Sequence, residues 1–259
     1  MERVRFFIAG VQKGGTTALD SFLRGHPSIQ MASVKEVHHF DDETLDWSAP
    51  DHGRLYEAFD WSAPDQPVRG EATPITLYWP DALERLRAYN PTAKLLIGLR
   101  HPTFRAFSHW RMERKRGWDD LPFGQAIGPD GRERVRCAPG GVHRVFSYVE
   151  RGLYARQVER LLTLFARSQV LFFRTDQLWL QPAHVLDAVQ DFIGVERRLM
   201  PQGRYVVPVD ATDLGSIPAE ERAQLDQVFA ADIRRTAKLS GLDLSDWLRP
   251  GYREPMSAC

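Results

Sequence analysis

Residues 4–17 read VRFFIAGVQKGGTT, and their pattern indicates how the fold begins. Its apolar run from Val4 to Ala9 predicts a short buried strand. Gly10 ends that run, and from Thr16 to Arg24 apolar residues recur at the spacing of a helix. The chain therefore opens with a strand, a glycine-rich loop and a helix.

Further along the chain, apolar runs alternate with helical patterns. AKLLIGL (93–99) and QVLFF (169–173) predict two more buried strands. Helical sequence follows each of them, at 102–116 and at 182–193. A strongly amphipathic stretch at 154–165 lies between the two strands. Strands that alternate with helices favour a parallel sheet covered on both faces. We expect an α/β fold of the P-loop-like, three-layer type, with a central, mostly parallel sheet flanked by helices.

No internal repeat or low-complexity linker divides the 259 residues, so we expect one domain over residues 1–259. Residues 117–141 are rich in Gly, Pro and Arg and predict a long loop over one face. An amphipathic helix is expected near Glu220 to Leu239.

Charge and composition exclude several classes of function. The net charge is zero, which gives no basic field for binding nucleic acid, so any polyanionic ligand needs a local cluster of cations. The only cysteines, Cys137 and Cys259, suggest neither a disulfide framework nor a metal motif. No apolar run approaches the roughly 20 residues that cross a bilayer, and the apolar start is too short for a signal peptide. We expect a cytoplasmic protein without membrane insertion.

The glycine-rich loop predicts a phosphate site. Its glycines permit tight turns whose backbone N–H groups face an anion, and the following helix adds the positive end of its dipole. Lys13 adds a full charge. The candidate binding residues are Gln12, Lys13, Gly14, Gly15, Thr16 and Thr17.

The spacing of this loop differs from that of nucleoside-triphosphate loops, in which lysine directly precedes Ser or Thr. Here two glycines separate Lys13 from Thr16. We also find no apolar strand that ends in a magnesium-binding Asp. A P-loop kinase acting on a small molecule remains an alternative, as does a tight turn that only caps a helix.

A second anion site is expected after the strand at 93–99. Arg100 follows that strand, and Ser108 lies two helical turns into the next element. A guanidinium bonds an anion in bidentate fashion, and the serine adds a hydroxyl donor. A solvated helix face is the alternative explanation of this pair.

The segment KEVHHFD, residues 35–41, gathers a base, two acids and two histidines. The adjacent histidines match no metal-ligand spacing, so we expect no metal there; a structural cluster on a loop is the alternative. A carboxylate such as Glu36 can remove the proton that makes a hydroxyl a poor nucleophile. Lys35 or His38 could hold Glu36 ionised and correctly aimed.

Three of these segments together resemble one enzyme family. QKGGTTAL (12–19) resembles the 5′-phosphosulfate loop of sulfotransferases that use 3′-phosphoadenosine-5′-phosphosulfate (PAPS), particularly the heparan sulfate 3-O- and N-sulfotransferases. LRHPTFRAFSHW (99–110) is similar to their 3′-phosphate segment, and KEVHHFD to the segment that carries their proposed general base. The resemblance covers about Phe6 to Arg204. It implies that Lys13 contacts the oxygen between phosphate and sulfate, that Arg100 and Ser108 hold the 3′-phosphate, and that Glu36 is the base with His38 beside it.

The same resemblance suggests two further site residues. RGEATP (69–74) is similar to a family segment along the cleft, so Glu71 is the second candidate base; Ala72 stands where the family has a lysine. Gly203-Arg204-Tyr205 resembles an element that closes over the nucleotide, which makes Arg204 a candidate for nucleotide binding.

The function expected from the sequence is the transfer of a sulfuryl group from PAPS to an acceptor hydroxyl, with adenosine 3′,5′-bisphosphate (PAP) as product and no metal. The acceptor is expected to be a carbohydrate, a glycolipid or a small-molecule metabolite. A PAP-binding module without catalysis is the competing class, but the loop lysine and the candidate base are both present. The choice between O- and N-sulfation and the oligomeric state stay open.

Overall fold

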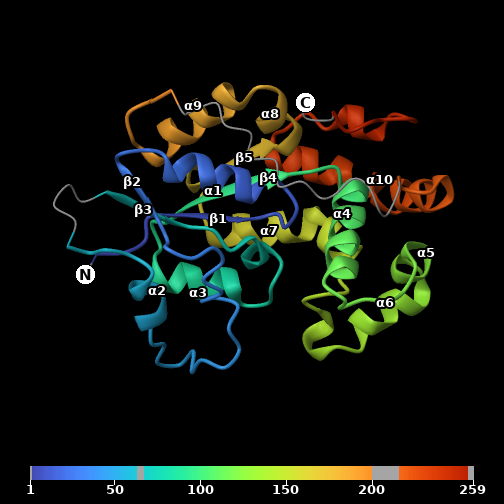
Figure 1. The fold of residues 1–259 in the computed structure, drawn as a ribbon, viewed down its shortest axis with the longest axis horizontal. Coiled ribbons are helices and arrows are strands. Elements are labelled where there is room, and N and C mark those ends of the chain that lie inside the picture. Colours follow the sequence, from blue (N-terminus) through green and yellow to red (C-terminus); the bar gives the residue numbers. More distant parts are fainter. Residues whose placement is uncertain (1, 63–66, 200–215, 256–259) are drawn as a thin grey trace. The chain divides into compact units, whose positions relative to one another are not determined.

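The computed structural model describes residues 2–62, 67–199 and 216–255 (Figure 1). These residues fall into two units, each built from separated parts of the chain. The first unit contains residues 2–62, 67–99 and 160–199, and the second contains residues 100–159 and 216–255. A single domain over residues 1–259 stays a prediction, and the two units are described separately below.

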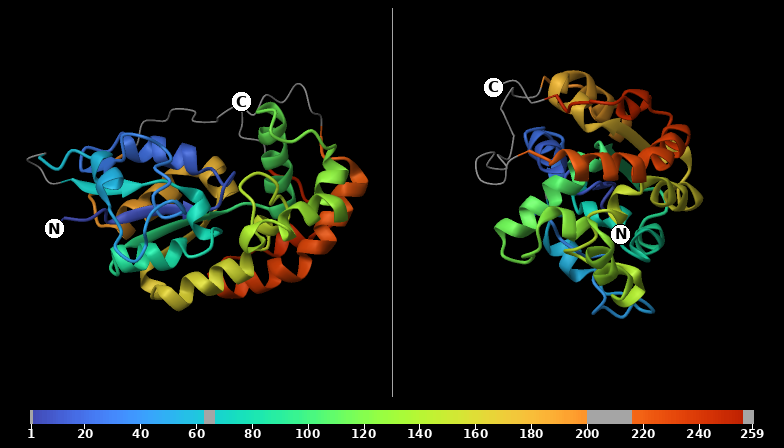
Figure 2. Two further views of the ribbon diagram at one scale, coloured as in Figure 1. Left: turned by 90° about the horizontal axis from the view of Figure 1, so that it is seen from below. Right: turned by 90° about the vertical axis from the view of Figure 1, so that its right-hand side faces the viewer.

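The first unit is organised around a five-stranded parallel sheet in the order β2-β3-β1-β4-β5. Strand β1 pairs with β4, and β4 pairs with β5, all in parallel; Figure 2 gives two further views of the chain. The strands are β1 (Phe6–Gly10), β2 (Ile29–Met31), β3 (Val68–Glu71), β4 (Lys94–Leu99) and β5 (Val170–Arg174). Since β1 is the middle strand, the loop that follows it leaves from the centre of the carboxyl edge of the sheet.

Helices cover both faces of this sheet (Figure 1). Phe6 and Ile8 of β1 share one buried core with Leu19 of α1, Leu178 of α8 and Val189 of α9. The helices and 3-10 turns of this unit are α1 (Thr16–Arg24), α2 (Gly53–Glu57), η1 (Pro74–Leu77), α3 (Ala82–Tyr89), η4 (Arg167–Gln169), α8 (Thr175–Leu180) and α9 (Pro182–Ile193).

The opposite face of the sheet is covered by α3 and the segment before α2. Successive side chains of a strand point to opposite faces, so Phe7 points away from Phe6. Its ring meets the ring of Phe40 at 5.6 Å and that of Tyr89, in α3, at 6.5 Å. The predicted three-layer α/β architecture with a parallel sheet is thus confirmed.

The second unit is helical. Its elements are α4 (Pro102–Lys115), α5 (Phe123–Ile127), α6 (Pro129–Arg136), η2 (Pro139–Gly141), η3 (Glu150–Gly152), α10 (Ala219–Ser240) and η5 (Ser245–Leu248), and α7 (Tyr154–Leu164) contains the boundary with the first unit. A hydrogen bond of 2.6 Å from the Thr103 hydroxyl to Asp226 joins α4 to α10.

The strands predicted at 4–9, 93–99 and 169–173 correspond to β1, β4 and β5 and are confirmed. Strand β3 was not predicted because it reads Val-Arg-Gly-Glu. Its Arg69 is nevertheless buried, because the guanidinium bonds Gln30 at 2.9 Å and Glu2 at 2.8 Å and lies over the Trp61 ring. Satisfied hydrogen bonds let a charged side chain be buried where an apolar pattern would not place one.

The predicted long loop at 117–141 is wrong, because two short helices and a 3-10 turn lie there. Phe123 and Ile127 of α5 and Val135 of α6 are buried. The segment folds onto these apolar side chains, and Pro129 occupies the first turn of α6, where its missing N–H costs nothing. Within the described ranges, no helix is both long enough and apolar enough to cross a bilayer.

Candidate active site

The loop between β1 and α1 has the geometry of an anion cradle. Gly15 has a left-handed φ of 78° and precedes α1, whose first turn holds no acidic residue and no capping side chain. A Cβ on Gly14 would lie 2.5 Å from the Gly98 carbonyl oxygen, so the close approach of the loop to β4 requires glycine. Thr16 and Thr17 are the first two residues of α1. An anion at this helix N-terminus faces backbone N–H groups and the positive end of the dipole.

This loop is held in place by its neighbours in the first unit. The Val11 N–H donates to the Gly98 carbonyl of β4 at 3.1 Å, and the Thr175 hydroxyl of α8 donates to the Gly14 carbonyl at 3.0 Å. Lys13 adopts a left-handed φ of 68°, a conformation that is costly for a residue with a Cβ. A fixed loop with a strained lysine is the type of arrangement expected at a binding site, and the predicted residues 12–17 lie together in it.

The second predicted anion site lies at the start of α4, in the second unit. Arg100 directly follows the end of β4, and Ser108 lies on α4. Ser108 is 6% exposed, and its hydroxyl has no hydrogen-bond partner among the residues that the structure describes. A buried hydroxyl without a partner is unusual in folded proteins and fits one that bonds a ligand.

Arg100 makes a contact that the sequence did not predict. Its Nε donates to Glu254 Oε1 at 2.7 Å and its Nη2 donates to Oε2 at 2.6 Å. The two residues are 154 positions apart, and no motif or periodicity marks Glu254. Only the folded chain reveals that this candidate phosphate-binding arginine is bonded to a carboxylate.

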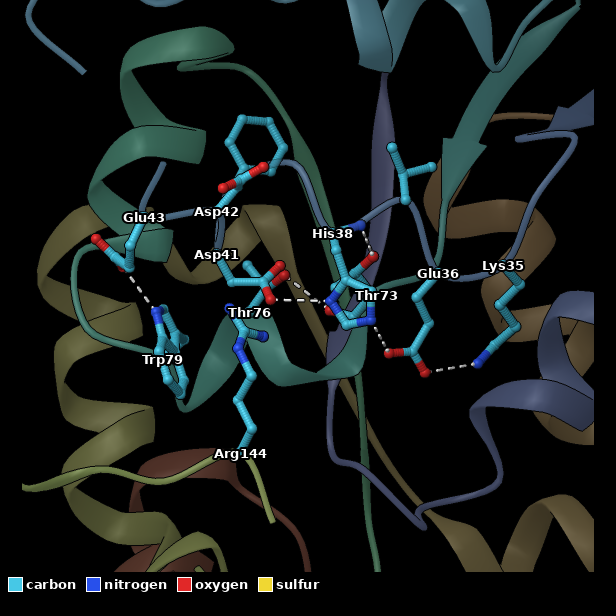
Figure 3. Close-up of polar contacts among 12 residues, drawn as sticks. Lys35, Glu36, His38, Asp41, Asp42, Glu43, Thr73, Thr76, Trp79 and Arg144 are labelled. Carbon is cyan, nitrogen blue, oxygen red and sulfur yellow. Dashed lines mark hydrogen bonds and ion pairs between the residues drawn. The ribbon is translucent and has the colours of Figure 1, made fainter. Parts of the chain in front are cut away.

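The candidate base lies in a network of charged side chains between β2 and α2 (Figure 3). Lys35 Nζ donates to Glu36 Oε1 at 3.2 Å, and His38 Nε2 lies 3.3 Å from Glu36 Oε2. On the other side of the ring, His38 Nδ1 lies 2.9 Å from Asp41 Oδ2. The four side chains form one chain of contacts in the order Lys35, Glu36, His38, Asp41.

Exposure decides what each member of this network can do. The Glu36 side chain is 25% exposed, so its carboxylate can meet a substrate, whereas the Asp41 side chain is fully buried. Asp41 therefore fixes the His38 ring rather than contacting a ligand. The two ring nitrogens of His38 each face a carboxylate, Glu36 on one side and Asp41 on the other. The Lys35 and His38 contacts hold the Glu36 carboxylate in a fixed position.

Glu71, the second candidate base, lies at the end of β3 and is 3% exposed. Its Oε1 accepts hydrogen bonds from the Thr73 hydroxyl at 2.5 Å and from the Val37 N–H at 3.3 Å. The Thr73 hydroxyl oxygen in turn accepts the His38 N–H at 3.3 Å. Burial raises the pKa of Glu71 to about 7. The Glu71 carboxyl and Thr73 thus anchor the backbone next to Glu36, a role for Thr73 that the sequence did not suggest.

The predicted site residues are therefore accounted for in three groups. The glycine loop, Glu36, His38 and Glu71 belong to the first unit, and Arg100 and Ser108 to the second. Arg204 lies outside the described residues, as does Cys259. In the described part of the chain, no three His, Cys, Asp or Glu residues are grouped to hold a metal ion.

Sequence comparison finds one family over most of the chain. A model of the sulfotransferase domain matches residues 3–202. The mouse (Mus musculus) heparan sulfate glucosamine 3-O-sulfotransferase 6 is 33% identical over 193 residues, which cover 73% of this chain and 52% of the mouse protein. The human (Homo sapiens) heparan sulfate glucosamine 3-O-sulfotransferase 3B1 is 31% identical over 201 residues, with 76% of this chain and 48% of the human protein covered. The chain thus spans about half the length of these curated relatives.

Comparison with solved structures gives similar folds. The crystal structure of a sulfotransferase from Alicyclobacillus acidocaldarius superimposes with a TM-score of 0.80 at 29% identity and covers 96% of this chain and 100% of that one. The sulfotransferase domain from the curacin biosynthetic pathway has a TM-score of 0.50 at 16% identity, covers 86% of this chain and 83% of that one, and supports the fold alone.

Proposed function

Because this chain belongs to the sulfotransferase domain family, we propose that it is an enzyme that transfers a sulfuryl group from PAPS to an acceptor hydroxyl. The observation that carries the proposal is the loop between β1 and α1. It combines a left-handed Gly15, a Gly14 that no larger residue can replace, and Lys13 at the uncapped start of a helix. These features suit the 5′-phosphosulfate end of the donor.

The donor-binding role of the chain is divided between two groups of residues. Residues 12–17 bind the 5′-phosphosulfate, and Arg100 with Ser108 binds the 3′-phosphate. The unpartnered Ser108 hydroxyl and the bidentate geometry of the Arg100 guanidinium both suit a phosphate. Arg204 is a further candidate for nucleotide binding on the resemblance of its segment alone.

In the reaction, bound PAPS supplies the sulfuryl group, and the phosphate to which that group is bonded is the leaving group. The Lys13 ammonium and the N–H groups at the start of α1 stabilise the negative charge that grows on the departing phosphate. The Glu36 carboxylate accepts the proton of the acceptor hydroxyl as that oxygen attacks in line. His38 and Lys35 hold Glu36 in place, and Asp41 orients His38.

The acceptor class is the finer part of the proposal. We propose a hydroxyl on a carbohydrate, a glycolipid or a small-molecule metabolite. The names of the relatives, which specify heparan sulfate glucosamine, support a sugar. Ala72 stands where the resemblance implies a lysine, so the proposal does not extend to heparan sulfate itself. The cytoplasmic location stays a prediction.

A transfer assay tests this function. The purified chain is incubated with sulfur-35-labelled PAPS and a panel of sugars, glycolipids and phenols, and both labelled product and PAP are measured by chromatography. We expect equal amounts of sulfated product and PAP, and loss of both in Lys13→Ala and Glu36→Gln. Binding of PAP without transfer to any acceptor would support the inactive binding module instead.

A further inference from the structure

The ion pair between Arg100 and Glu254 has the form that a bound phosphate would take. Two parallel bonds, of 2.7 and 2.6 Å, join the guanidinium edge to the two carboxylate oxygens. Both side chains are largely buried, with exposed fractions of 17% for Arg100 and 12% for Glu254. A guanidinium recognises carboxylate and phosphate through the same bidentate geometry. The edge that is bonded to Glu254 is therefore not open to a second anion at the same time.

Glu254 reaches Arg100 because the segment before it is fixed to the start of α4. The ring of His101 stacks on that of Tyr252 at 4.9 Å with an interplanar angle of 11°, and His101 Nε2 lies 3.2 Å from the Trp247 carbonyl oxygen. From α10, Arg222 Nη2 donates to the Tyr252 carbonyl at 2.9 Å. All of these residues belong to the second unit. The segment that carries Glu254 is thus held beside the start of α4 by contacts other than the ion pair.

We propose that Glu254 is an intramolecular competitor of the donor's 3′-phosphate for Arg100, and that it sets the affinity of the enzyme for the donor nucleotide. This inference rests on the proposed function, in which Arg100 and Ser108 bind the 3′-phosphate. Nucleotide binding requires Glu254 to leave the Arg100 edge, whereas the Ser108 hydroxyl has no partner to give up within the described residues. Release of PAP is favoured when Glu254 returns.

The change in PAP affinity follows from the fraction of molecules in which Arg100 is not bonded to Glu254. The apparent dissociation constant equals the intrinsic constant divided by that fraction. If Glu254 holds Arg100 in about nine molecules of ten, removing its charge tightens PAP binding about tenfold, which corresponds to about 1.4 kcal/mol. Nucleotides without a 3′-phosphate do not use Arg100, so their affinity should not change.

Titration calorimetry on the full chain tests the inference with PAP and adenosine 5′-monophosphate (AMP) as probes, at one fixed salt concentration. Glu254→Gln keeps the size of the side chain and removes its charge. Glu150→Gln is the matched control, since it removes a carboxylate from another arginine pair in the same unit, that with Arg132 at 2.8 Å. We expect about tenfold tighter PAP binding in Glu254→Gln alone, unchanged AMP binding in both variants, and no tightening when Arg100→Ala is combined with Glu254→Gln.

Each outcome separates this inference from the proposed function. If Arg100→Ala weakens PAP binding but Glu254→Gln leaves it unchanged or weakens it, Glu254 is not a competitor, while the donor site stands. If neither the parent chain nor Glu254→Gln binds PAP, the proposed function fails and the inference fails with it. Glu254→Ala, which also removes the carboxylate, must tighten PAP binding in the same way; it replaces Glu254→Gln if that variant does not fold.

Discussion

Replacing Glu71 with glutamine should change how the stability of the protein depends on pH. Burial, with smaller contributions from the Glu36 and Asp41 carboxylates, raises the pKa of Glu71 from its ordinary value of 4.5 to about 7. The unfolded chain therefore releases this proton at lower pH than the folded protein does. The stability that Glu71 contributes is therefore fully present below about pH 4.5, falls as pH rises, and is lost above about pH 7.

The size of this fall follows from the two pKa values. One pKa unit corresponds to about 1.4 kcal/mol, so the whole shift contributes up to about 3 kcal/mol. Between about pH 5.5 and about pH 8, linkage gives a fall of about 2 kcal/mol in the free energy of unfolding from this group alone. Glutamine does not titrate, and its carbonyl oxygen can still accept the hydrogen bonds that Val37 and Thr73 donate to Glu71.

Urea unfolding followed by tryptophan fluorescence, at several pH values across this range, measures the effect. Between the two ends of the range, the free energy of unfolding of the parent chain should fall by about 2 kcal/mol more than that of Glu71→Gln. Groups that titrate in both proteins cancel in this difference. Glu57→Gln, the same change at an exposed position of α2, is the control and should track the parent. If the difference in free energy of unfolding between the parent and Glu71→Gln stays constant to within about 0.5 kcal/mol, the pKa of Glu71 is not raised by burial.

Three further predictions concern catalysis. Lys13→Ala should lower kcat/KM for sulfuryl transfer about 100-fold to 1000-fold, because the proposed site then lacks the ammonium that stabilises the leaving phosphate. A change below about tenfold in steady-state assays would contradict that role. Glu36→Gln should lower kcat at least about 100-fold, while Glu71→Gln stays within about tenfold of the parent, because only Glu36 accepts the proton of the acceptor. The reverse order would make Glu71 the base. Turnover should persist in excess EDTA, since Lys13 and the N-terminus of α1 supply the positive charge, and a loss that magnesium restores would count against this mechanism.

The parts of the fold that the sequence predicted share a simple physical signal. Strands β1, β4 and β5 are mainly apolar, because a parallel strand covered by helices on both faces buries side chains on both of them. The glycine loop was recognisable because Gly14 and Gly15 stand where the backbone admits nothing larger or requires a left-handed φ. Patterns of this kind are local, so they can be read from a single sequence.

The parts that it missed depend on contacts between distant residues. Strand β3 is buried although it contains Arg69, whose partners Gln30 and Glu2 lie 39 and 67 positions away. The helices at 123–127 and 129–136 form in a stretch whose Gly and Pro content predicted a loop, because a few apolar side chains there are buried. The pairing of Arg100 with Glu254 joins residues 154 positions apart and follows no spacing rule.

Thermal stabilisation of the chain by PAP, compared with ADP and with ATP plus magnesium, tests whether the protein binds the donor nucleotide of a sulfotransferase. A ligand that binds only the folded protein raises the melting temperature by mass action. A PAPS-dependent sulfotransferase should be stabilised by PAP in preference to the other nucleotides, and Lys13→Ala and Arg100→Ala should lose that stabilisation. Stabilisation by ATP with magnesium, and none by PAP, would contradict the sulfotransferase function and favour a P-loop kinase.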